Sequence, residues 1–220
     1  MSEIRAVIFD VDGTLVDSND AHAHAWVAAL AEHGHAISYE HIRALIGMGG
    51  DKLLPAGADI ASESEEGRQI SKRRGAIFAE RFLPHLRAFP EVRALLEQLH
   101  AQGLKLAVAS SAKDEELKPL LALTGAAELF ETTTSSSDAK HSKPDPDIVQ
   151  ATLKRLDLPA AQVVMVGDTP YDIEAAARAG ISLIALRCGG WDGSALGAAQ
   201  AVYADPAELL AQLANSPLAQ

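Results

Sequence analysis

Short apolar runs recur along the chain, and segments with helical spacing separate them. The clearest runs are residues 4–9, 104–109, 163–166 and 181–186, with weaker ones at 129–134 and 201–204. Runs of this length, rich in branched side chains, are typical of strands buried on both faces. One buried helix face, with the i, i+3, i+4, i+7 spacing, is formed by Val92, Leu95, Leu96 and Leu99. The alternation predicts an α/β fold, a doubly wound, Rossmann-like parallel sheet with helices on both faces.

One long segment interrupts this alternation. From residue 18 to residue 87 the pattern is helical, with no convincing strand, and Ser62 with Glu65 is a candidate capping box for one of its helices. A helical block of this size is too long for a simple crossover between two strands. We therefore predict an inserted α-helical cap domain at residues 18–87, and an α/β catalytic core formed by residues 1–17 and 88–220.

Composition and charge narrow the classes of function. Hydrophobic residues make up 48% of the 220 residues and charged residues 22%, as in ordinary globular proteins. No apolar run approaches the roughly 18 residues of a membrane span, the apolar start is too short for a signal peptide, and the single cysteine fits a reducing compartment. We expect a cytoplasmic protein that binds no membrane. The net charge of −11 argues against nucleic-acid binding, and it means that a site for a phosphate needs a local cation.

Two aspartates directly follow the first predicted strand. Asp10 and Asp12 stand two residues apart, and Gly13 after them permits a sharp turn. Carboxylates this close repel one another unless one is protonated or a cation lies between them. A solvated acidic turn is the alternative interpretation. It explains poorly why Asp10 comes directly after four apolar residues.

A second acidic motif follows the predicted strand at residues 163–166, where Asp168 and Asp172 stand at a glycine-bearing turn. In a doubly wound sheet, ligands bind at the carboxyl ends of strands where the strand order reverses. If these two strands flank the reversal, Asp10, Asp12 and Asp168 converge, and such hard oxygen donors favour magnesium over zinc. The alternatives are a helix N-cap for Asp168 and a purely structural role for Asp172.

Two further residues at predicted strand ends suit a phosphate group. Ser110 follows the strand at residues 104–109, and its hydroxyl and the adjacent amides are able to hold phosphate oxygens. Ser111 is a competing candidate, and a serine before a helix is also a common cap. Lys143 precedes a proline-started helix and is able to neutralise charge on a phosphoryl group. An isolated lysine would otherwise be a surface residue.

The order of these four motifs, each at the end of its own strand, resembles the haloacid dehalogenase superfamily of phosphohydrolases. The resemblance covers essentially the whole chain and is to the branch with a helical cap after the first strand. The first motif of that family matches Asp10 to Thr14, its hydroxyl motif Ser110, its lysine Lys143, and its acidic motif Asp168 with Asp172. The phosphoglycolate phosphatase and β-phosphoglucomutase groups are the most similar, with His22 and Trp26 as mutase-like features.

The resemblance implies roles for these residues. Asp10 would be the nucleophile that forms an aspartyl-phosphate, and Asp12 the general acid and base. Mg²⁺ would be held by Asp10, the backbone carbonyl of Asp12 and Asp168, with Asp172 supporting. Lys143 would neutralise charge on the phosphoryl group. The phosphate would contact Gly13, Ser110 and Ser111. His22 would gate the site near Asp12, and the alternative is an ordinary, partly exposed histidine.

We predict a magnesium-dependent phosphatase that acts on a small phosphorylated metabolite such as phosphoglycolate or a sugar phosphate, most simply as a monomer, with a dimer as the alternative. A β-phosphoglucomutase-like isomerase is the main competing function. The loop at residues 47–52 weakens it, because it lacks the arginine that the mutase group tends to place there. A dehalogenase, a phospho-accepting receiver and a catalytically silent scaffold rank lower. Candidate contacts for a second anionic group are Lys52, Lys72, Arg73 and Arg74.

Overall fold

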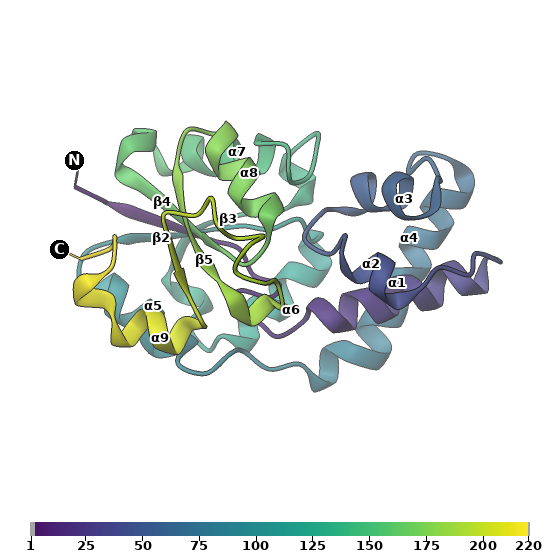
Figure 1. Cartoon of the computed structure of the whole chain (residues 1–220), viewed down its shortest axis with the longest axis horizontal. Coiled ribbons are helices and arrows are strands. Elements are labelled where there is room, and N and C mark those ends of the chain that lie inside the picture. The colour runs from purple at the N-terminus through teal and green to yellow at the C-terminus, as the bar shows by residue number, and fades with distance from the viewer. Residues whose placement is uncertain (1–2, 220) are drawn as a thin grey trace.

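The computed structural model describes residues 3–219, and its centre is a six-stranded sheet with the order β3-β2-β1-β4-β5-β6 (Figure 1). Every neighbouring pair of strands is parallel. The strands are β1 (Ala6–Phe9), β2 (Lys105–Ala109), β3 (Phe130–Thr134), β4 (Val163–Gly167), β5 (Ser182–Leu186) and β6 (Ala201–Tyr203). Each predicted strand is present with bounds close to those predicted, so the α/β doubly wound fold is confirmed.

Helices cover both faces of this sheet, as the continuous apolar strands require. The helices are α5 (Val92–Ala101), α6 (Asp114–Leu123), α7 (Asp147–Leu156), α8 (Pro170–Arg178) and α9 (Pro206–Ala211). Ala6 and Ile8 of β1 belong to the core layer beneath α7 and α8, whereas Val7 and Phe9 belong to the layer that includes α5 and α9 (Figure 1). Successive side chains of a strand point to opposite faces, which explains why the whole of β1 is buried.

Between β1 and β2 the chain is helical, as predicted. This helical segment contains α1 (Asn19–Glu32), α2 (Tyr39–Arg43), α3 (Gly50–Ala58) and α4 (Glu65–Ile77), which lie together beyond one end of the sheet (Figure 1). The cap of α4 is a single Ser64 N-cap two residues after the predicted position, and Gly67 at N3 has no side chain to complete a capping box. A turn in which the Ser64 amide donates to the carbonyl of Ala61 delays α4, so that Ser64, and not Ser62, accepts from the amide of Gly67 at 3.0 Å. The domain boundaries at residues 18 and 87 stay a prediction.

The strand order reverses at β1, which lies between β2 and β4. Asp10 follows β1, Ser110 follows β2 and Asp168 follows β4, so all three stand at the same edge of the sheet. The chain beyond β1 stays aligned with its neighbour, since the Asp10 amide donates to the carbonyl of Val166 at 2.9 Å. Among residues 3–219, no helix has the length and apolar character that a membrane crossing requires.

Candidate active site

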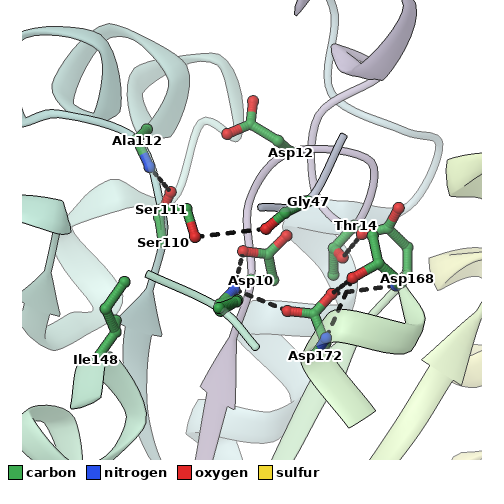
Figure 2. Close-up of polar contacts among 12 residues, drawn as sticks. Asp10, Asp12, Thr14, Gly47, Ser110, Ser111, Ala112, Ile148, Asp168 and Asp172 are labelled. Atoms are coloured by element: carbon green, nitrogen blue, oxygen red, sulfur yellow. Dashed lines mark hydrogen bonds and ion pairs between the residues drawn. The ribbon is translucent and has the colours of Figure 1, made fainter. Parts of the chain in front are cut away.

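Three buried carboxylates meet at the carboxyl ends of β1 and β4. Asp10, Asp168 and Asp172 each offer an oxygen within 4.8 Å of the others (Figure 2). Asp168 is completely buried, and Asp10 and Asp172 are nearly so. The predicted convergence of the two acidic motifs is therefore present, although Asp172 and not the Asp12 side chain supplies the third carboxylate.

Both oxygens of Asp168 are held in place by hydrogen bonds. Oδ1 accepts from Thr14 Oγ1 at 2.9 Å, and Oδ2 accepts from Asn19 Nδ2 at 2.8 Å. Two glycines make room for this carboxylate. A Cβ atom at Gly13, which has φ +77°, would lie 2.3 Å from Asp168 Oδ2, and one at Gly189 would lie 1.8 Å from it. Sequence reasoning found Gly13 from the turn but missed Asn19 and Gly189, which lie in no recognisable motif.

Thr169, and not Asp168, caps the following helix α8. The Thr169 side chain accepts from the amide of Asp172, and Asp172 accepts from the amide of Thr169, which together form a capping box. The N-cap alternative for Asp168 is therefore wrong. Asp172 has the structural role that the sequence left open, and it also contributes its other carboxylate oxygen to the acidic cluster.

Lys143 neutralises part of this cluster. Its Nζ lies 2.5 Å from Asp10 Oδ1 and 2.8 Å from Asp172 Oδ1, and its side chain is 1% exposed. Burial disfavours the ammonium, but the two carboxylates outweigh this effect and raise the pKa of Lys143 above its ordinary value. Lys143 is therefore a permanent cation in contact with Asp10, and the alternative of a solvated surface lysine is wrong.

One lysine does not balance three carboxylates. Burial, and then repulsion from Asp172, raises the pKa of Asp10 to about 7, although Lys143 opposes the change. Burial, and then repulsion from Asp172 and Asp10, raises the pKa of Asp168 well above its usual range. An all-oxygen donor set of three carboxylates with one lysine lacks two positive charges when ionised, which fits a hard divalent cation. Asp10, Asp168 and Asp172 are thus able to hold a metal ion.

Metal affinity should therefore depend on pH. A metal ion binds the deprotonated carboxylate, and the pKa of Asp10 lies at about 7 without metal. Below that pH a proton must leave before the ion binds, so we expect Mg²⁺ affinity to rise about tenfold from pH 6 to pH 8. Calorimetric titration in buffers of different ionisation enthalpy measures both the affinity and the released proton. An affinity that does not change with pH would contradict the proposed ligand set.

Asp12 lies apart from the acidic cluster (Figure 2). Its Oδ1 accepts from Ser18 Oγ at 2.5 Å and lies 2.8 Å from His22 Nε2. Burial opposes the charge on Asp12, but His22 and Ser18 more than offset this effect and lower its pKa below the usual value. The sequence placed His22 near Asp12, and the structure brings these two residues into contact.

Of the predicted phosphate-binding residues, Ser111 and His22 line a small cavity beside Asp10, whereas Gly13, Ser110 and Lys143 are not part of its lining. Its lining includes Asp10, Asp12, Gly47, Ser111 and Ala112. Ser110 is completely buried behind them, and its hydroxyl accepts from the amide of Ala112 at 3.0 Å (Figure 2). Ser111 and Ala112 therefore line the space beside Asp10, while Ser110 shapes the turn that presents them.

Comparison with known proteins decides the family. The sequence profile described as "Haloacid dehalogenase-like hydrolase" matches residues 7–186. The chain belongs to this family. It is 33% identical over 190 residues to a phosphoglycolate phosphatase of Yersinia pseudotuberculosis, covering 84% of this chain and 82% of that protein. It is 30% identical over 183 residues to a pyrophosphatase of Oceanobacillus iheyensis, covering 83% of each. A crystal structure of a hydrolase from Pseudomonas syringae superimposes with a TM-score of 0.91 at 30% identity, covering 98% of this chain and 100% of that one.

In this hydrolase of the haloacid dehalogenase-like family, the helical segment is hydrogen-bonded to the residue next to the site lysine. The amide of Gly49 donates to Ser142 Oγ at 3.0 Å, and Ser142 Oγ and its amide donate to the two oxygens of Asp51 at 2.5 and 3.1 Å. Nearby, Lys52 pairs with Asp145 at 2.6 Å. We call this group of contacts around Ser142 the Ser142 clasp. It joins the N-cap and first turn of α3 directly to the segment that carries Lys143.

Proposed function

We propose that this hydrolase is a magnesium-dependent phosphatase for small phosphorylated metabolites and that it acts through an aspartyl-phosphate on Asp10. The observation that carries the proposal is the position of Asp10. It contacts a buried lysine, lies close to two further buried carboxylates, and also lines a cavity that Ser111 and Ala112 share. Two relatives of this chain are a phosphoglycolate phosphatase and a pyrophosphatase, and their activities support phosphate-ester or phosphoanhydride hydrolysis here.

In the first step, an oxygen of Asp10 attacks phosphorus, and the bond between phosphorus and the ester oxygen breaks. The departing alkoxide takes a proton from Asp12. Without substrate the pKa of Asp12 is lowered, and this carboxyl is charged. A phosphate dianion in the cavity beside it places like charge close to the carboxylate, which raises its pKa and favours the protonated form that this step needs.

In the second step, water attacks the phosphorus of the aspartyl-phosphate, and the bond to Asp10 breaks. Asp12 takes a proton from that water as it attacks, which is the reverse of its first role. His22 and Ser18 both contact Asp12 Oδ1 and so orient this carboxyl in its charged state. Phosphate then leaves, and Asp10 is regenerated.

Charge neutralisation is divided between the protein and the metal. Asp10 and Asp168, with Asp172 supporting, would hold Mg²⁺, which supplies positive charge to the transferring phosphoryl oxygens when bound. The backbone carbonyl of Asp12 is a further ligand proposed by family resemblance. Lys143 contacts the nucleophile and Asp172, and Ser111 would hold a phosphoryl oxygen from the cavity side.

The test is a screen of phosphorylated metabolites that measures released inorganic phosphate, with Mg²⁺ present and then with a chelator. We expect release from small phosphomonoesters that stops with the chelator and returns when Mg²⁺ is added in excess. Conversion of a hexose phosphate into its isomer without release of phosphate would instead support the mutase. Phosphate release that survives exhaustive chelation would contradict the metal assignment.

A further inference from the structure

The structure separates the four basic residues that the sequence offered as contacts for a second anionic group. Lys52 is paired with Asp145 at 2.6 Å, and Arg73 is paired with Glu32 on the exposed side of α4, with 2.9 Å between Arg73 Nη2 and Glu32 Oε1. Arg74, the neighbour of Arg73, points the opposite way and lines the small cavity beside Asp10. Lys72 lines a second, larger cavity that continues from it.

Arg74 stands where these two cavities meet. It lines both of them, together with Trp26 and Ser111. Its side chain is buried, yet its Nε has no hydrogen-bond partner within the described part of the chain. Nη1 donates to Glu116 Oε2 at 2.7 Å, and the guanidinium carbon lies 5.1 Å from the centre of the Trp26 ring. A buried guanidinium with a free donor beside a substrate cavity is suited to an acidic group of the ligand.

The larger cavity has a volume of about 550 Å³ and is basic, in contrast to the acidic protein around it. Lys72, Lys113 and Lys140 line it, and none of them has an acidic partner among residues 3–219. Asp51 is the one acid in this lining, and Ser142 donates hydrogen bonds to both of its oxygens. The potential in this cavity therefore favours anions.

We propose that Arg74, with the lysines of the larger cavity beyond it, binds a second anionic group of the substrate at the end remote from the phosphate that is cleaved. This inference rests on the proposed function and names its substrate class: small phosphomonoesters that also carry a carboxylate or a second phosphate. A short substrate would reach Arg74 alone. A longer one would place its second anion among Lys72, Lys113 and Lys140.

The proposal explains how an acidic enzyme binds a doubly anionic ligand. The first phosphate meets Lys143 and the proposed metal, and the second anion meets a separate set of cations. Glu116 holds Arg74 in position until the ligand offers its Nε a charged acceptor. A neutral substrate of the same length would leave that buried donor unpaired, and this difference is the source of discrimination.

The experiment compares matched substrates in matched variants. Phosphoglycolate is paired with ethyl phosphate, and butane-1,4-diol bisphosphate with butyl phosphate, so that each pair differs in the remote anion. In Arg74→Met we expect the ratio of kcat/KM for phosphoglycolate to that for ethyl phosphate to fall about 10- to 100-fold. In a Lys72→Met, Lys140→Met double variant we expect the bisphosphate ratio to fall about fivefold. Arg73→Met, whose side chain pairs with Glu32 outside both cavities, should leave both ratios unchanged.

Each outcome decides the proposal. A fall in either ratio in Arg74→Met supports it, and the pair affected tells carboxylate recognition from phosphate recognition. Arg74→Lys should restore part of the ratio, because it retains a cation. Equal kcat/KM within both pairs in the parent enzyme, or ratios that Arg74→Met does not change, would overturn it. Calorimetry on the Asp10→Asn protein tests the same point without turnover and shows whether each variant binds ligand at all. The ratio of Kd for phosphoglycolate to that for ethyl phosphate is measured with and without Arg74→Met. The proposed function fails separately, if no phosphomonoester of either kind is hydrolysed.

Discussion

Replacing Asp10 with asparagine should abolish turnover and leave the fold intact. Asparagine has nearly the same shape but no anionic oxygen to attack phosphorus, so we expect kcat to fall by at least about 10⁴-fold. The free energy of unfolding should change by no more than about 1 kcal/mol, because Lys143 keeps its pair with Asp172 and the substitution removes a carboxylate whose ionisation burial already opposes. Phosphate release from p-nitrophenyl phosphate and urea denaturation measure the two quantities.

Asp17→Asn provides the matched control, because Asp17 is an exposed aspartate in the same stretch of chain. It should keep the activity of the parent enzyme. Hydrolysis by Asp10→Asn at a rate close to that of the parent would show that another residue is the nucleophile. A large loss of stability in Asp10→Asn would mean that the lost activity says nothing about chemistry.

Replacing Lys143 with methionine should destabilise the protein severely when no divalent metal is present. The change leaves Asp10 and Asp172 buried and without their cation, and removal of one partner from a buried ion pair costs about 3–5 kcal/mol. An acid whose folded pKa lies above its unfolded value destabilises the fold increasingly as pH rises from the unfolded pKa to the folded one. The loss should therefore be smaller at pH 5, where Asp10 is protonated, than at pH 8.

Urea denaturation in a chelating buffer at both pH values measures this loss, and Lys154→Met, at an exposed lysine of α7, serves as the control. Addition of Mg²⁺ should restore part of the stability of Lys143→Met, because the ion would supply positive charge to the same carboxylates. A loss that is equal at pH 5 and pH 8 would contradict the electrostatic explanation and point to packing of the lysine stem.

The sequence revealed the sheet and the acidic motifs for a common reason. Strands buried on both faces must be apolar along their whole length, so β1 and β4 stand out as short runs that end at Asp10 and near Asp168. Parallel topology then brings those ends together, and the convergence needed no knowledge of contacts far apart in the sequence. The partly exposed β3, with its three threonines, gave a weaker pattern for the same reason.

Features that depend on tertiary contacts were not predictable in this way. The sequence did not predict α3 as a separate helix, because Pro55 and several glycines interrupt the apolar spacing. Its buried apolar side chains are Leu53 and Leu54. Asn19 and Gly189 become site residues only because folding places them against Asp168. The sequence offered Arg73 and Arg74 as equal candidates. Adjacent residues on a helix point in different directions, and only the packing of α4 shows which one faces the cavity.

The Ser142 clasp couples any movement of the helical segment to the chain segment that carries Lys143. Any swing of the helical segment away from the sheet must break the bonds between Ser142 and the residues Gly49 and Asp51, and Ser142 is covalently joined to Lys143. Asp10 and Asp172 hold the Lys143 ammonium independently of these bonds, so the nucleophile would keep its cation while the helical segment moves. The backbone on either side of Ser142 would be the part that responds to an arriving ligand.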